Sequence, residues 1–108
     1  MTQKKSDEQV LAEIDLAVAQ VEGFANPRLT ESGTACIADD DAGHGFRYEP
    51  TGDGRLTAEL MKKYKISVMY SAHTGLWYAY FSVAEFQHVG KISEVAVARA
   101  VASKGRTL

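Results

Sequence analysis

Two apolar runs of strand length, separated by a short turn, constrain the fold of this chain most strongly. Residues 76–82 read Leu-Trp-Tyr-Ala-Tyr-Phe-Ser, and they follow the apolar run 66–70 after a gap that ends in Gly75. Two such runs joined by a short turn with a glycine predict an antiparallel β-hairpin. We therefore expect this hairpin to organise the fold.

The second strand of the hairpin is predicted to be apolar on both faces. Side chains alternate along a strand, so Trp77 and Phe81 should face one way while Tyr78 and Tyr80 face the other. One face should pack on helices, and the other needs a cover. Burial in the core or self-association is the favoured interpretation, while a different protein partner, or a nucleobase stacked on the rings, stays open.

The N-terminal region carries the strongest helix signal. Ser6 and Gln9 have the spacing of a capping box, and apolar residues then recur every three or four positions as far as Val21. Gly23 stands where a left-handed residue closes a helix. The sequence therefore predicts an amphipathic helix over residues 7–22.

Two further helices and two short strands complete the expected layout. Residues 56–64 predict a short helix with Thr57 as its cap, and the alanine-rich residues 93–103 predict a helix buried between layers or against a partner. Short strands are expected at residues 34–38 and 46–48, and residues 83–91 are expected to be a connection. The order α-β-β-α-β-β-α predicts an α+β fold, a small antiparallel sheet with helices packed on it.

Length and charge narrow the class of protein. The 108 residues suit a single domain over 1–108, with residues 1–5 as a flexible N-terminal extension, and the net charge of −2 offers no field for nucleic acid. No stretch approaches the roughly 20 apolar residues that cross a bilayer, and the polar start lacks the apolar core of a secretory signal. We expect a cytoplasmic protein that does not bind membranes. Nucleic acid is a disfavoured partner, because only a local patch could bind it.

The loop ahead of the short helix is a candidate ligand site. It consists of Thr51, Gly52, Asp53, Gly54 and Arg55. Free backbone N–H groups at a helix start, with an arginine alongside, bind phosphates and carboxylates, so a nucleotide or other small anion is one interpretation, with Trp77 or Tyr78 stacking on it. A structural turn is the alternative, because the loop lacks the spacing of known phosphate loops and its aspartate repels anions.

Other reactive side chains give weaker signals. His44 beside the acidic triplet 39–41 matches no metal-site spacing, and Cys36 lies in an apolar run, where a buried and inert thiol is expected. His73 and His88 are expected to be exposed and incidental. We expect no cofactor and no enzymatic activity; a hydrolase that uses Cys36 is the last alternative.

From about residue 16 onward the chain resembles the NinX-like family of small bacteriophage proteins. The resemblance rests on the helix end at Gly23, the Tyr-x-Pro-Thr-x-Asp stretch at 48–53, the aromatic strand at 77–81 and the C-terminal Ala-Ser-Lys at 102–104. The resemblance covers about four fifths of the chain. No single motif is specific, so the resemblance depends on the order of the motifs. The chain departs from the family at residues 54–56, where members usually have a Gly-Gly-Pro turn.

The resemblance implies a phage accessory protein that acts in the bacterial cytoplasm, and it carries no reaction with it. Together with the surplus of interface-type aromatic residues, it leads to the expectation of a non-enzymatic binding module, a homo-oligomer that acts on a bacterial host protein, for example to inhibit a defence system. The runner-up is a binder of a small anionic or nucleotide ligand at residues 51–55.

Overall fold

The N-terminal helix begins and ends where its sequence predicts. In the computed structural model, which describes residues 5–81 and 87–105, α1 (Asp7–Glu22) starts after Ser6, and Ser6 and Gln9 form the reciprocal hydrogen bonds of a capping box. Gly23 closes the helix with φ of 77°. Of the predicted flexible extension, residues 1–4 lie outside the described residues, and the Lys5 Nζ lies 2.6 Å from Glu13 Oε1.

The chain then forms a first antiparallel sheet in the order β1-β2-β3. Its strands are β1 (Ala25–Leu29), β2 (Cys36–Asp39) and β3 (Gly45–Arg47). The last two are the predicted strands, whereas no strand was predicted at the position of β1. Asn26 has φ of 48°, and the pairing with β2 shifts register inside β1, so the alternation that marks a strand is lost.

Helix α2 (Gly54–Tyr64) is capped by Asp53 rather than by Thr57. The carboxylate of Asp53 accepts hydrogen bonds from the backbone N–H groups of Arg55 and Leu56, at 2.9 and 3.4 Å. Thr57 is buried inside the first turn, and its hydroxyl donates to the Pro50 carbonyl at 3.1 Å. The prediction of Thr57 as the cap is wrong because the helix begins earlier, at Gly54, and the Asp53 carboxylate already accepts from the N–H groups of its first turn.

The predicted hairpin is the main part of a second antiparallel sheet. Strands β4 (Ser67–Ser71) and β5 (Leu76–Tyr80) pair along their whole length, and Gly75 completes the turn with φ of 73°. A third strand, β6 (His88–Gly90), pairs with β5. The prediction of a connection over residues 83–91 is therefore wrong at β6, and residues 82–86 lie outside the described residues.

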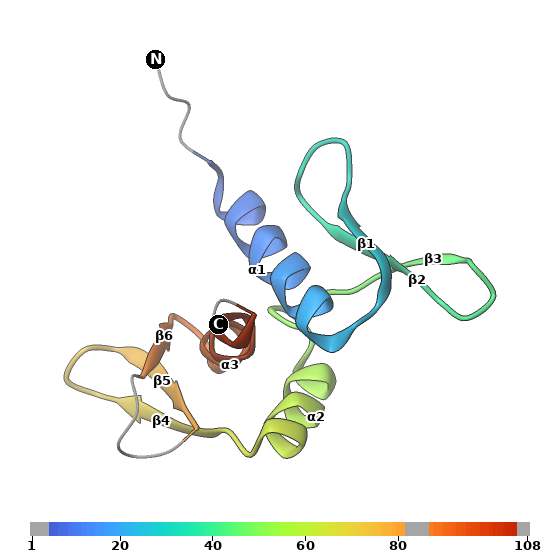
Figure 1. Ribbon diagram of the computed structural model, residues 1–108. Coiled ribbons are helices and arrows are strands. Elements are labelled where there is room, and N and C mark those ends of the chain that lie inside the picture. The colour runs from blue at the N-terminus through green and yellow to red at the C-terminus, as the bar shows by residue number, and fades with distance from the viewer. Residues whose placement is uncertain (1–4, 82–86, 106–108) are drawn as a thin grey trace.

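Helix α3 (Ser93–Lys104) occupies the centre of the fold. It lies between the β4-β5-β6 sheet on one side and α1 and α2 on the other (Figure 1). This confirms the prediction of a helix buried between layers. The α+β class is confirmed as well, but the strands form two separate three-stranded sheets instead of a single small sheet, in the order α-β-β-β-α-β-β-β-α.

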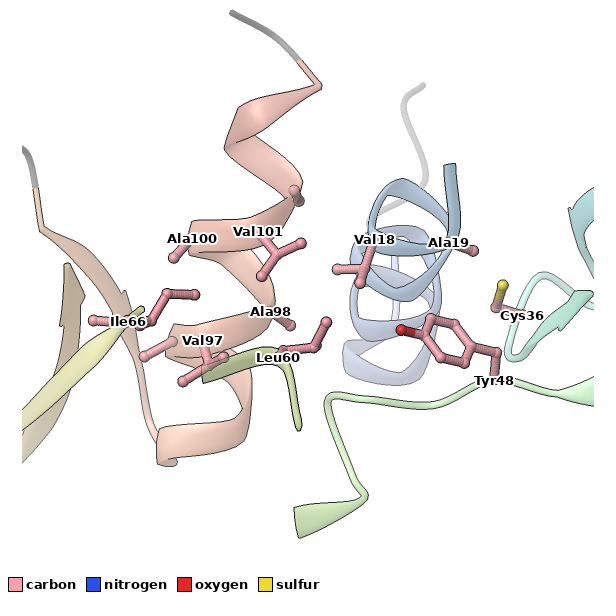
Figure 2. Packing of buried hydrophobic residues seen from close by; sticks show 13 residues of the cluster. Val18, Ala19, Cys36, Tyr48, Leu60, Ile66, Val97, Ala98, Ala100 and Val101 are labelled. Carbon is pink, nitrogen blue, oxygen red and sulfur yellow. The ribbon is translucent and has the colours of Figure 1, made fainter. Parts of the chain in front are cut away.

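Small side chains on α3 allow its neighbours to approach closely. Val97 and Val101 are fully buried, and Figure 2 shows them with Ile66 on one side and Val18 of α1 on the other. Gly90 of β6 also needs to be small, because a Cβ there would lie 2.6 Å from the Ala96 backbone nitrogen. The core thus depends on close backbone contacts around α3.

Candidate functional site

Thr51 lies in the candidate ligand loop but points into the protein. It is 4% exposed, and both its backbone N–H and its hydroxyl donate to the carboxylate of Asp15 at 2.9 Å. Burial raises the pKa of Asp15 to about 6, while the two hydrogen bonds from Thr51 act in the opposite direction. Thr51 therefore links the turn to α1, and its polar groups are engaged.

The helix start beside it is also engaged. The N–H groups of Arg55 and Leu56, which an anion would use, already donate to the Asp53 carboxylate. Gly52 and Gly54 are open to solvent, and neither takes positive φ. An anion would have to displace Asp53, so binding at Thr51–Arg55 remains a prediction that these contacts do not favour.

The cavity next to this loop has an acidic character. Its volume is about 310 Å³, and Glu8, Asp15 and Glu49 line it together with Thr51 and Gly52. Arg47 also lines it, but the Arg47 guanidinium is paired with Glu49 at 2.7 Å. Three carboxyl groups and one neutralised arginine disfavour a negatively charged ligand.

The aromatic residues of β5 divide between the two faces of the sheet as predicted. Trp77 and Phe81 face the core with the fully buried Ala79, and the ring of Trp77 lies 5.2 Å from that of Tyr70. Tyr78 and Tyr80 are half-buried on the opposite face, where the Tyr78 hydroxyl donates to Thr74 Oγ1 at 3.2 Å. Trp77 is thus partly buried against the core, with the ring of Tyr70 beside it.

The structure does not bring the two groups of predicted site residues together. The cavity beside Thr51 and Gly52 has none of the β5 aromatic residues in its wall. In Figure 1 the start of α2 lies far from the turn of the β4-β5 hairpin, with α3 between them. A ligand held by residues 51–55 and stacked on Trp77 or Tyr78 is not supported by this geometry.

A groove that the sequence did not reveal lies between α1, α3 and the β5-β6 edge. Its volume is about 420 Å³. Apolar side chains make up most of its wall, namely Val10, Leu11, Leu76, Val89, Ile92 and Val95, and Gly90 and the charged residues Asp7, Lys91 and Arg99 complete it. Ile92 is 45% exposed, which is high for a large aliphatic residue. The wall comes from three distant segments, so no local pattern could have predicted it.

Cys36 is buried, whereas His44 is exposed and His88 is half-buried. Burial raises the pKa of the Cys36 thiol to about 11, as expected for an inert core cysteine. His44 is exposed, with Nδ1 3.9 Å from Asp40 Oδ2. His88 is half-buried in β6 and packs edge-on against Phe81, so the prediction of an exposed, incidental residue is wrong.

In residues 5–81 and 87–105, no group of three or more His, Cys, Asp or Glu side chains is placed to hold a metal ion. No helix within that same part of the chain has the length and apolar content to cross a membrane. A scan against protein-family models and a search of curated proteins both found no match to the chain.

Proposed function

We propose that this chain is a small phage-encoded accessory protein that binds a bacterial host protein and acts as a binding module rather than as an enzyme. The observation that carries the proposal is the apolar groove with the exposed Ile92 at its rim. The resemblance to NinX-like phage proteins supports a host protein as the partner, and inhibition of a defence system is its most concrete form.

The groove suits an apolar segment of a protein better than a polar small molecule. Aliphatic side chains from α1, β5, β6 and α3 form its walls, while Lys91 and Arg99 outweigh Asp7 and give its charged residues a net positive charge. The Arg99 guanidinium is held there by a 2.8 Å hydrogen bond to the Val89 carbonyl. An amphipathic segment with a few apolar anchors and an acidic neighbour matches this arrangement.

Ile92 provides a test that separates binding from folding. It is the N-cap residue of α3, but its side chain makes no capping hydrogen bond. Aspartate is among the best N-cap residues, so Ile92→Asp should preserve or increase the free energy of unfolding while it places a charge in the apolar groove. The matched control is Ala42→Asp, which adds the same charge to the exposed β2-β3 turn.

The experiment uses affinity capture from bacterial lysate, followed by titration of the recovered protein in purified form. We expect wild-type protein and Ala42→Asp to bind it equally and Ile92→Asp to bind at least about tenfold more weakly, since a buried anchor residue contributes more than about 1.4 kcal/mol. Capture of no host protein in repeated trials, or equal affinity for Ile92→Asp, would refute the proposal.

A further inference from the structure

Strand β4 forms an edge of the second sheet. Its five residues pair with β5 in continuous register, from Ser67 opposite Tyr80 to Ser71 opposite Leu76. Across the described part of the chain, β4 pairs with no other strand. In an antiparallel pair, alternate residues direct their N–H and C=O groups away from the partner strand, so β4 presents a row of backbone groups on its outer side.

The other three sheet edges carry features that discourage further pairing. Edge strand β1 contains Pro27 and an irregular register, and β3 has only three residues, with Arg47 in an ion pair with Glu49. Edge strand β6 is equally short, and its Val89 carbonyl already accepts a hydrogen bond from Arg99. Proline, short length, charge and side-chain capping are the usual protections of an edge.

Strand β4 has none of these protections. It reads Ser-Val-Met-Tyr-Ser, without charge, proline or glycine. Met69 is 48% exposed and Tyr70 is 52% exposed. A continuous, uncharged and partly apolar edge is a template for an added strand.

We propose that β4 pairs antiparallel with β4 of a second copy of this chain, around a twofold axis at Met69. The β4-β5-β6 sheet of one copy and the same sheet of the second copy would then form one continuous six-stranded sheet. A twofold axis requires a surface that matches itself. Pairing about Met69 places Ser67 opposite Ser71 and Val68 opposite Tyr70, so that no like charges meet within the strand.

The residues that flank the strand are compatible with the same register. Lys65 precedes β4 and would face the turn residue His73 of the second copy, so that two lysines do not oppose each other. The inference is independent of the proposed host partner, because β4 contributes no residue to the apolar groove.

The first test measures the mass in solution by light scattering coupled to size exclusion. The chain has a mass of 11.8 kDa, and we expect the native protein to show about twice that value. Met69→Lys should raise the dissociation constant of the dimer at least about tenfold, because two lysines would then meet at the axis. Ala42→Lys, with the same charge in a distant turn, should leave the dimer intact.

The second test fixes the register by cross-linking. Opposed residues of an antiparallel pair have Cα atoms about 4.5–5.5 Å apart, which a disulfide spans. Met69→Cys should therefore form a disulfide-linked dimer on mild oxidation. Ser67→Cys alone should not, because the two copies of residue 67 would lie about 13 Å apart, whereas a mixture of Ser67→Cys with Ser71→Cys should cross-link. Wild-type protein is the control, since its Cys36 is buried.

A monomeric native protein would overturn the proposal, as would a dimer that Met69→Lys leaves unchanged. Failure of Met69→Cys to cross-link within a confirmed dimer would exclude this strand pairing. Met69 is exposed, so the substitutions should not prevent folding, and circular dichroism of each variant checks this directly.

Discussion

Asp15 in the middle of α1 accepts two hydrogen bonds from Thr51, one from the backbone N–H and one from the hydroxyl, each at 2.9 Å. Asp15 is only 3% exposed, and the negative charge of the nearby Glu49 disfavours ionisation of the Asp15 carboxyl group. This pair holds the turn before α2 against α1. It also makes the stability of the fold depend on pH.

We expect Asp15→Asn to gain stability relative to wild type as the pH rises. Burial raises the pKa of Asp15 from 3.8 to about 6 in the folded chain. Because the folded pKa is the higher one, its stabilising contribution is complete below the unfolded pKa and is lost as the pH rises through about 6. The difference in free energy of unfolding between the two proteins should change by about 2–3 kcal/mol between about pH 4 and pH 8. Urea titrations at both pH values measure it, and a difference independent of pH would contradict the assignment.

Asp15→Ala is the companion variant, with the opposite expectation. It leaves both donors of Thr51 buried and unpaired, so we expect a loss of about 1–3 kcal/mol in the free energy of unfolding at about pH 4. The loss should be smaller at about pH 8, because wild-type protein has by then lost the contribution of protonated Asp15. The same urea titrations measure both values, and wild-type stability in Asp15→Ala at about pH 4 would show that the link to Thr51 is dispensable.

Gly90→Ala should destabilise the fold by about 1–3 kcal/mol, because the added Cβ would lie 2.6 Å from the Ala96 nitrogen and 2.9 Å from the Ile92 carbonyl oxygen. The matched control is Gly54→Ala at the first position of α2, where a Cβ meets nothing within 4 Å. That variant should be neutral or more stable by up to about 1 kcal/mol. Thermal unfolding of the two variants makes the comparison, and equal midpoints would argue against the close packing of β6 on α3.

Asp53→Ala should lower the free energy of unfolding by about 1 kcal/mol through loss of the N-cap of α2, and Asp53→Ser should restore most of it.

The Asp53 carboxylate also stands where an anion would bind. Asp53→Ser therefore offers a check on the runner-up function, through thermal shifts with a panel of nucleotides. A nucleotide that stabilises wild-type protein would revive that function, and we expect none.

The Cys36 thiol should react slowly in the folded protein. Its pKa of about 11, against an ordinary value of 9.0, lowers the thiolate population about 100-fold at neutral pH, and burial blocks access as well. Reaction with an aromatic disulfide reagent should therefore be slower than in urea-unfolded protein by at least that factor. Rapid modification in the native state would instead favour the hydrolase alternative.

The parts of the fold that the sequence predicted are those with local signals. Ser6, Gln9 and Gly23 define α1 without help from the rest of the chain, and the hairpin follows from two apolar runs around Gly75. Helix α3 was recognisable as buried because its alanines and valines leave almost no polar face.

The missed parts depend on contacts between distant segments. Strands β1 and β6 are short or irregular and are held by pairing with β2 and β5. Thr51 looked like a ligand residue because Asp15, its partner, lies 36 positions away. The apolar groove has the same origin, since Leu11, Leu76 and Ile92 meet only after folding.

The central position of α3 has a consequence for synthesis. This helix contributes much of the buried core yet comes after α1, α2 and both hairpin strands in the chain. While the ribosome adds residues up to 92, the surfaces of those earlier elements that pack on α3 remain uncovered. The core therefore closes only late in translation, and a nascent chain stalled before Ser93 should be a ready substrate for chaperones and proteases.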